Sequence, residues 1–352
     1  MKPVYIVSWL FALAISFVSC DDWLDKTPKD RLYPDVYFKT EDELRLFTNQ
    51  FYNNLVPSAV DIYSESSDLI VKSDLMLEMS GQRIIPDEGN GWNFTALRDI
   101  NFYLQYSHNG TEVNARNRYD GVARFFRAYF YFEKVKRYGD IPWYDKALDS
   151  DDPELYKARD SREFVMQKML EDLDFAIANL PKTKNAYVLT RWTALALKSR
   201  VCLFEGTFRK YHGLEDCEKY LNACVSASET FMNESGYTLY KSGSTPYRDL
   251  FASINLQADE VIFGRDYEAS LSVLHNVQNY ENSTTMGRPG MNKKIVNSYL
   301  MADGSRFTDK AGYETMTFDQ ECQNRDPRLA QTIRTPGYTR IGSTKKEAPN
   351  LA

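Results

Sequence analysis

Apolar residues recur at helical spacing through most of the first 235 positions. In the segment 41–55 the apolar positions are Leu44, Phe47, Phe51 and Leu55. They lie on one face of a helix. Thr40 and Glu43 have the spacing of a capping box, so the helix is expected to begin there. The same periodicity predicts further helices over 92–106, 112–138, 161–180, 190–211 and 214–232.

A weak internal sequence repeat, at an offset of 73 residues, indicates that these helices form repeated pairs. Ala123, Arg127 and Tyr138 recur as Ala196, Arg200 and Tyr211, and a second predicted helix follows each copy. Helix pairs with small residues at the crossing point are typical of tetratricopeptide-like repeats. Helix 112–138 is apolar on more than one side, which predicts burial on several faces.

The pattern changes after residue 235. Segments 236–240 and 261–263 are predicted to be short extended pieces, 276–294 a polar surface loop, and 294–301 a short helix. Residues 58–91 are mixed and rich in glycine and proline, which predicts a loop with one short helix. The sequence therefore predicts a mainly α fold of helix pairs, with long irregular excursions and a few short strands.

The N-terminus has the form of a lipoprotein signal. An apolar run over 4–18 is too short for the roughly 20 residues of a membrane span. It follows Lys2 and ends in Ser19 and Cys20. We expect a signal peptide over 1–19 and a thioether-linked lipid on Cys20, with acyl chains such as palmitate. The alternative is an ordinary signal peptide cut elsewhere.

The rest of the chain is divided accordingly. A tether is predicted over 20–40, where Pro28 and Pro34 prevent a continuous helix. One helical domain is predicted over 41–335. The segment 336–352 has no capping or strand signal, so we expect a truncated tail there.

Composition adds an excess of aromatic residues and a negative charge. The 352 residues include 24 Tyr, 20 Phe and 5 Trp, and the formal net charge is −6. The negative charge disfavours nucleic acid as a partner. Aromatic rings can stack on the apolar faces of sugars, although most of them are expected to fill the helical core.

Signatures of catalysis and of cofactor binding are missing from the sequence. It contains neither a GxxxxGK[ST] nor a GxGxxG loop, and no GxSxG; the three histidines never form HExxH. We therefore expect no metal, no cofactor and no enzymatic activity. The sequence leaves open the alternative of a glycosidase with a pair of catalytic carboxylates, because it does not reveal how far apart the 49 acidic residues lie in space.

Four cysteines remain after Cys20. Cys217 and Cys224 are seven residues apart on one predicted helix, about 10 Å along its axis. That distance is too long for a disulfide. Cys202 could reach either of them only if two helices pack as a hairpin. We expect Cys202, Cys217, Cys224 and Cys322 to be buried free thiols.

The best candidate for a binding site surrounds Trp92. Asn90 and Asn93 flank it, and Arg83 and Asp87 precede it at a loop-to-helix junction, where binding residues often occur. The alternative is that Trp92 anchors the start of the helix in the core. Tyr280, in the polar loop, is a second candidate for ligand contact.

Several segments resemble the SusD/RagB family of outer-membrane glycan-binding lipoproteins. These are 20–28, 37–44, 123–132 with the closing 138–142, 194–201, 301–304 and 324–328, which occur in the family's order. The most specific is ARFFRAYFYF at 123–132, closed by YGDIP. Members are usually longer than 352 residues, so the resemblance implies that a C-terminal part is missing here.

The resemblance implies a SusD-like α-solenoid with four tetratricopeptide-like helix pairs. It also implies a non-enzymatic lipoprotein on the outer face of the outer membrane. Its partner would be a SusC-like, TonB-dependent importer, to which it passes captured oligosaccharide. The family's sugar contacts follow no fixed motif, so none is carried over by position. A scaffold of the same fold that binds a peptide or protein partner stays as an alternative, as does a lipoprotein glycosidase.

Overall fold

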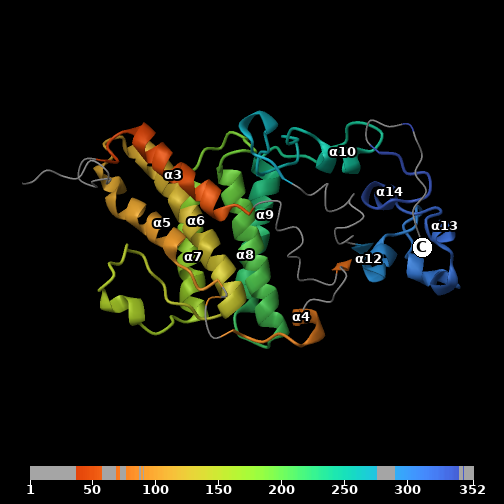
Figure 1. Ribbon diagram of the computed structural model, residues 1–352, viewed down its shortest axis with the longest axis horizontal. Coiled ribbons are helices and arrows are strands. Elements are labelled where there is room, and N and C mark those ends of the chain that lie inside the picture. Colours follow the sequence, from red (N-terminus) through yellow and green to blue (C-terminus); the bar gives the residue numbers. More distant parts are fainter. Residues whose placement is uncertain are drawn as a thin grey trace, which may run out of the picture.

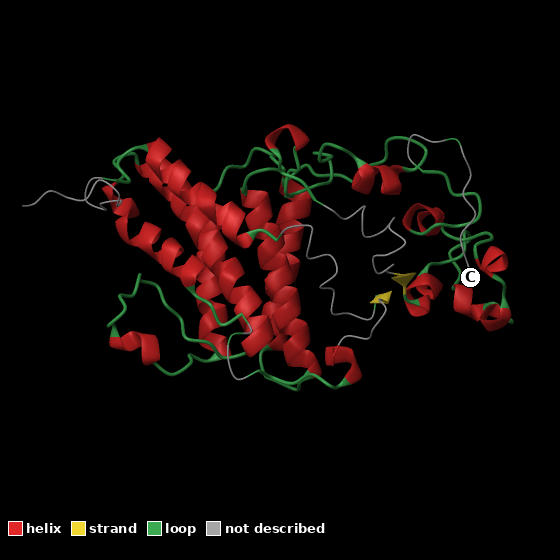
Figure 2. Ribbon diagram, viewed as in Figure 1, coloured by secondary structure: helices red, strands yellow, loops and turns green. Residues whose placement is uncertain are grey.

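Long helices packed side by side make up most of the described residues up to 235 (Figures 1 and 2). The computed structural model describes residues 37–57, 69–71, 77–86, 89, 91–275, 290–340 and 344. The long helices in this part are α3 (Glu41–Leu55), α5 (Thr95–Tyr106), α6 (Val113–Tyr138), α7 (Arg162–Asn179), α8 (Arg191–Tyr211) and α9 (Cys217–Glu234). Among the described residues no helix is both long enough and apolar enough to cross a membrane.

The remaining elements are short. The helices are α4 (Leu77–Ser80), α10 (Pro246–Ala252), α12 (Lys293–Ser298), α13 (Phe318–Glu321) and α14 (Pro327–Thr332). Strands β1 (Ile70–Val71) and β2 (Gly290–Met291) pair antiparallel, with Ile70 opposite Met291. The predicted short helix within 58–91 is confirmed by α4. Most of the predicted loop 276–294 lies outside the described residues.

Local capping residues set the ends of the long helices. The Thr40 hydroxyl and the Glu43 carboxylate form the predicted capping box of α3. Ser161 and Thr190 cap α7 and α8 through their side chains. Gly139, at a positive φ of 71°, ends α6. These signals act within one turn of chain, so the predicted bounds agree closely with the observed ones.

The helices associate in pairs, as the internal sequence repeat predicts. The α6–α7 and α8–α9 pairs pack most extensively, and α3 and α5 pack on each other and on α6. A Cβ added to Gly121 would lie 3.3 Å from Leu180, and one added to Gly206 only 2.7 Å from Leu221. Small residues therefore do permit close crossing. The repeat is degenerate at the residue level, because Arg127 is buried whereas Arg200 is exposed.

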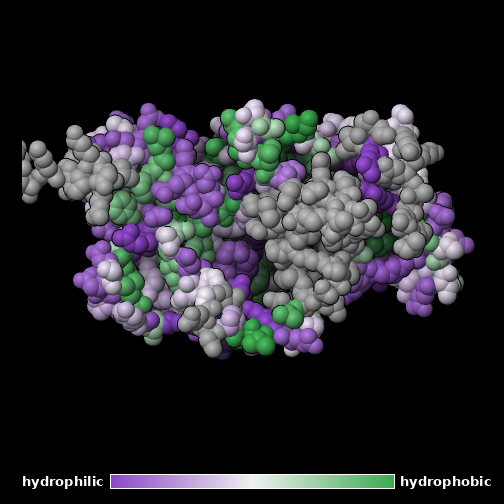
Figure 3. Space-filling view, viewed as in Figure 1, coloured by the Kyte–Doolittle hydropathy of each residue, from purple (hydrophilic) through white to green (hydrophobic). Residues whose placement is uncertain are grey.

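Aromatic side chains fill most of the core between these helices. Its largest fully buried members include Phe38, Phe51, Tyr103, Phe126 and Tyr131. Helix α6 is buried on several faces, as predicted. On the face shown in Figure 3, hydrophilic and hydrophobic residues are interspersed across the part of the chain that is coloured. The aromatic excess therefore serves mainly to build the core.

The predicted extended pieces lie outside any helix, and they do not pair as strands. Segments 236–240 and 261–263 have no strand pairing. A single backbone bond joins Thr238 N–H to the Asp259 carbonyl at 2.9 Å. The predicted helix 294–301 also ends early, at Ser298, because Leu300 and Met301 form bridges to Arg306 and Arg325.

Residues 290–340 form a small unit at the far end of the molecule from α5 (Figure 1), which contacts earlier residues through the β1–β2 pairing and the packing of α14 on α10. Arg325 lies at its centre and is 6% exposed. Its guanidinium donates to the carbonyls of Glu321 at 2.9 Å and of Val296 and Tyr299 at 2.8 Å, and lies 3.9 Å from the Phe307 ring centroid. The two family-like segments 301–304 and 324–328 are thus parts of one interlocked structure.

The four described cysteines are unpaired, although α8 and α9 do form the hairpin that a disulfide would need. Only Cys202 is fully buried. Cys217, Cys224 and Cys322 are partly exposed, so the expectation of buried thiols is wrong for these three. Burial raises the pKa of Cys202 to about 12, which keeps its thiol protonated and unreactive at neutral pH.

Candidate ligand-binding cavity

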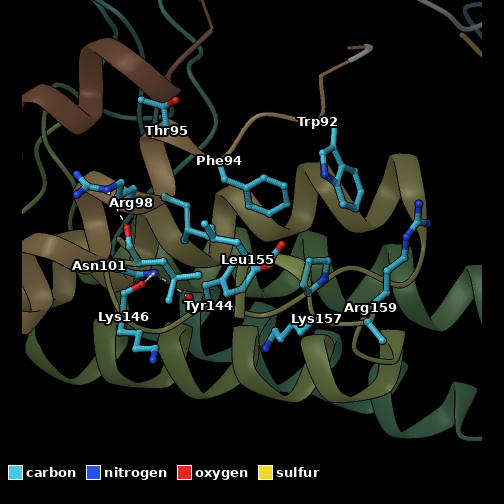
Figure 4. A pocket seen from close by; sticks show the side chains of 14 residues that line it. Trp92, Phe94, Thr95, Arg98, Asn101, Tyr144, Lys146, Leu155, Lys157 and Arg159 are labelled. Atoms are coloured by element: carbon cyan, nitrogen blue, oxygen red, sulfur yellow. Dashed lines mark hydrogen bonds between the residues drawn. The ribbon is translucent and has the colours of Figure 1, made fainter. Parts of the chain in front are cut away.

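A cavity of about 510 Å³ lies beside the start of α5 (Figure 4). One wall is the chain that enters α5 together with its first turns. The other wall is the segment 142–159 that follows α6. Its lining is Trp92, Phe94, Thr95, Leu97, Arg98, Asn101, Pro142, Tyr144, Lys146, Leu148, Leu155, Lys157, Ala158 and Arg159. Apolar and aromatic side chains predominate, and a few polar groups converge among them, as in many small-molecule sites.

Glycines place Trp92 at the edge of this cavity. Gly89 and Gly91 both have positive φ, and the Trp92 N–H donates to the Gly89 carbonyl at 3.1 Å. A Cβ at position 91 would lie 3.3 Å from the Tyr138 hydroxyl, so a larger residue would crowd α6. Lys134 of α6 donates to the Gly91 carbonyl. The chain before α5 is therefore fixed on α6, and Trp92 is held with it.

Trp92 is partly packed and partly open. Its ring lies edge-to-face with Tyr138 at 4.9 Å and with Phe94 at 5.3 Å. The Arg159 guanidinium lies 4.9 Å from the ring centroid. The residue stays 40% exposed. Trp92 therefore helps to anchor the start of α5 and also presents an aromatic surface to the cavity, while its contact with a ligand stays a prediction.

Hydrogen bonds hold the opposite wall in place. The Tyr144 N–H donates to the Tyr131 hydroxyl at 2.6 Å, and the Tyr144 hydroxyl donates to the Glu154 carbonyl at 3.1 Å. Lys157 donates to the Trp143 carbonyl at 2.6 Å. Burial raises the pKa of Tyr144, so its hydroxyl stays protonated. Tyr144 can therefore serve as a neutral aromatic contact.

A buried polar network supports the cavity floor. Asn101 of α5 donates to the Tyr144 carbonyl at 2.8 Å and accepts from Arg127 at 3.3 Å. Arg127 forms a two-point ion pair with Asp172 of α7, at 2.6 and 2.7 Å. This network joins α7, α6, α5 and the 142–159 segment, so the cavity shape depends on helices far apart in the sequence.

The residues predicted to form the site are divided by α5. Trp92 lines the cavity described above. Asn93 lines a second, more polar cavity of about 880 Å³, and its Oδ1 accepts from the Thr95 N–H at 2.8 Å. The Asn93 side chain therefore holds the turn that leads into α5. Arg83 is exposed and lines neither cavity. Asp87, Asn90 and Tyr280 lie outside the described residues.

Sequence reasoning missed the wall formed by Tyr144, Leu155, Lys157 and Arg159. The adjacent aromatic residues Trp143 and Tyr144 directly after the 138–142 turn were the available signal. They could have been placed opposite Trp92 only with knowledge of how α5 packs on α6. Among the described residues, no group of three or more His, Cys, Asp and Glu side chains could hold a metal ion.

Comparison with known proteins places this architecture in a family. A model described as "Starch-binding associating with outer membrane" matches residues 80–191, which include the whole cavity lining, and a SusD family model matches residues 228–350. Two SusD-like proteins of Formosa agariphila are 26% identical over 294 residues and 20% identical over 297 residues. The matches cover 78% and 76% of this chain and 55% and 52% of the relatives, so the chain spans about half their length.

Solved structures share the fold. A SusD-like protein from Bacteroides fragilis matches with a TM-score of 0.68 and 23% identity, over 87% of this chain and 63% of that one. A SusD-like carbohydrate-binding protein from the same species also matches with a TM-score of 0.68, at 17% identity, over 90% and 63%. The paired helices, the two family models and these relatives agree: the chain belongs to the SusD/RagB family.

Proposed function

We propose that this protein binds oligosaccharide in the Trp92 cavity and passes it to a SusC-like, TonB-dependent importer. The observation that carries the proposal is the cavity itself. Trp92, Phe94 and Tyr144 provide aromatic surface, and the walls are fixed by hydrogen bonds before any ligand arrives. A preformed site of this kind avoids the entropic cost of ordering loops around a flexible sugar.

Binding without turnover is the chemistry that this lining suits. Aromatic faces stack on the apolar faces of pyranose rings, and the polar side chains at the rim orient the hydroxyls. No Asp or Glu lines the cavity, so it offers no carboxylate pair for glycoside hydrolysis. We therefore propose a binding protein, not a glycosidase.

The proposed location is the outer face of the outer membrane. Support comes from the signal that ends at Cys20, from Asp21 and Asp22 after it, and from the outer-membrane association in the matched family's description. A lipid on Cys20 would hold the protein at the membrane surface. Mass spectrometry of the N-terminal peptide tests this, and an unmodified Cys20 in protein recovered from the cytosol would contradict it.

Calorimetric titration with a panel of oligosaccharides tests the binding function. We expect Trp92→Ala to lower the affinity for the sugar by about tenfold or more. Tyr211→Ala on α8 is the matched control, because Tyr211 is 82% exposed and lies outside the cavity lining.

If none of the oligosaccharides in the panel binds to the protein, the proposal is wrong. So would sugar binding that Trp92→Ala leaves unchanged, because the site would then lie elsewhere. Retained association with an importer in the absence of any sugar binding would favour the alternative of a peptide- or protein-binding scaffold.

A further inference from the structure

Four of the side chains that line the Trp92 cavity are cationic, and none is anionic. They are Arg98, Lys146, Lys157 and Arg159. The chain as a whole carries a formal net charge of −6, so this lining departs from the average surface. A concave site lined by one sign of charge attracts ligands of the opposite sign.

Three of the four cations already have carboxylate partners. The pairs are Lys146–Glu154 at 3.2 Å, Lys157–Asp160 at 3.1 Å and Arg98–Asp149 at 4.0 Å. Their charges are largely balanced within the 142–160 segment. These cations therefore shape the wall, and they leave little charge over for a ligand.

Arg159 differs from the other three. It is exposed, and among the described residues no carboxylate pairs with it. Its guanidinium lies 4.9 Å from the Trp92 ring centroid, at the end of the cavity where Trp92 lies (Figure 4). A planar guanidinium binds carboxylate or sulfate through two parallel hydrogen bonds. An unpaired cation thus stands beside the aromatic surface proposed to hold a sugar ring.

We propose that the cavity binds an anionic saccharide. The carboxylate or sulfate of the sugar would pair with Arg159, and the ring would lie against Trp92 and Tyr144. This inference rests on the proposed function, because it names the chemical class of the bound oligosaccharide. It is independent of the importer and of the lipid anchor.

The test titrates the whole chain with three oligosaccharides of equal length: an oligogalacturonide, a sulfated oligogalactan and a neutral oligogalactan. We expect one or both anionic sugars to bind about tenfold more tightly than the neutral one. Tighter binding of the oligogalacturonide would indicate recognition of a carboxylate, and tighter binding of the sulfated oligogalactan would indicate recognition of a sulfate. The preference should shrink as salt is raised, because a rim charge is screened.

Variants assign the preference to one side chain. Arg159→Gln should remove the preference for the anionic sugars over the neutral one, whereas Arg159→Lys should retain part of it. Arg45→Gln is the matched control, since Arg45 is an exposed arginine of α3 outside the cavity lining. Circular dichroism checks that each variant folds.

Two results separate this inference from the proposed function. If the neutral sugar binds as tightly as the anionic ones and Trp92→Ala abolishes its binding, the anionic preference is wrong and saccharide binding stands. If none of the sugars in this test or in the wider panel binds, both are wrong.

Discussion

At the scale of single residues, Asp172 has more influence on the cavity than its distance from it suggests. It is 2% exposed and pairs with Arg127 at 2.6 Å, while Arg124 lies 3.6 Å away. Arg127 in turn holds Asn101, which holds the Tyr144 backbone. A buried charge that loses its partner is costly, whereas an apolar replacement of the whole pair is often tolerated.

We therefore expect Asp172→Asn to lower the free energy of unfolding by about 3–5 kcal/mol, because it leaves the Arg127 charge buried and unpaired. Urea denaturation measures this. The double variant Arg127→Met/Asp172→Leu should recover much of the loss. A double variant less stable than the single one would contradict this account.

The residue scale also shows what the sequence could reveal about the site. Trp92 was identifiable because an aromatic residue among amides at a loop-to-helix junction is unusual. Its neighbour Asn93 lines a different cavity, because the turn before α5 directs the two side chains to opposite sides of the helix. Arg159 lies 67 positions along the chain, and its place over Trp92 follows only from tertiary packing.

At the scale of elements, the α8–α9 pair depends on a glycine. A Cβ at Gly206 would lie 2.7 Å from Leu221 Cγ and 3.1 Å from the Leu221 backbone nitrogen. The backbone cannot move aside without separating the helices. An alanine there gains about 1 kcal/mol of helix propensity over glycine, but overpacking costs about 1–3 kcal/mol.

Gly206→Ala should therefore be neutral to destabilising, by up to about 2 kcal/mol, despite the gain in helix propensity. Gly121→Ala in α6 is the comparison, because the nearest atom there is a side-chain carbon of Leu180 at 3.3 Å. In thermal unfolding, the melting temperature of Gly206→Ala should be lower than that of Gly121→Ala. The reverse order would show that the α8–α9 contact is looser than described.

A second set of contacts joins α7, α8 and α9 through Glu163. Its carboxylate lies 2.5 Å from Arg209, 2.9 Å from Lys219 and 3.0 Å from the Tyr220 hydroxyl. Burial alone would raise the pKa of Glu163. The hydrogen bonds from Lys219 and Tyr220 and the charge of Arg209 outweigh burial, so the pKa is lowered.

The lowered pKa predicts a pH dependence. The stabilisation from Glu163 is present above the unfolded-state pKa of about 4.3 and is lost as the pH falls through the folded-state value. Glu163→Gln should be less stable than the unmodified protein near neutral pH. The difference between their free energies of unfolding should become smaller as the pH is lowered. Urea denaturation at several pH values tests this. Glu229→Gln on the exposed side of α9 should show no such narrowing.

The elements differ in how well sequence predicts them, and the reason is the range of the signal. Helices α3, α7 and α8 begin where Thr40, Ser161 and Thr190 cap them, which is information held within four residues. The two strands pair residues 70–71 with 290–291, far apart in sequence, and each is two residues long. No periodicity exists in so short a segment, so the strands could not be predicted.

At the scale of the whole molecule, the chain divides into a large helical part and a smaller C-terminal unit. The main core draws its buried members from residues between Phe38 and Tyr220. Phe307 and Leu329 are buried in the unit 290–340, outside that core. The helical part was predictable from its apolar periodicity. The C-terminal unit was not, because an arginine and backbone carbonyls organise it, with few apolar residues.

This division predicts that the two parts open separately. Arg325→Met removes a donor from the buried Glu321 bond and from the partly buried bonds to the Val296 and Tyr299 carbonyls, and an unsatisfied buried carbonyl costs about 1–3 kcal/mol. Hydrogen exchange should therefore accelerate across 290–340, while α5 to α9 keep their protection. Arg328→Met is the matched control, because the Arg328 side chain is 60% exposed and donates to the Asp326 carboxylate, not to backbone carbonyls, so its loss should cost less than the loss of Arg325. Faster exchange throughout α5 to α9 in the Arg325 variant would show that the molecule unfolds as one cooperative unit.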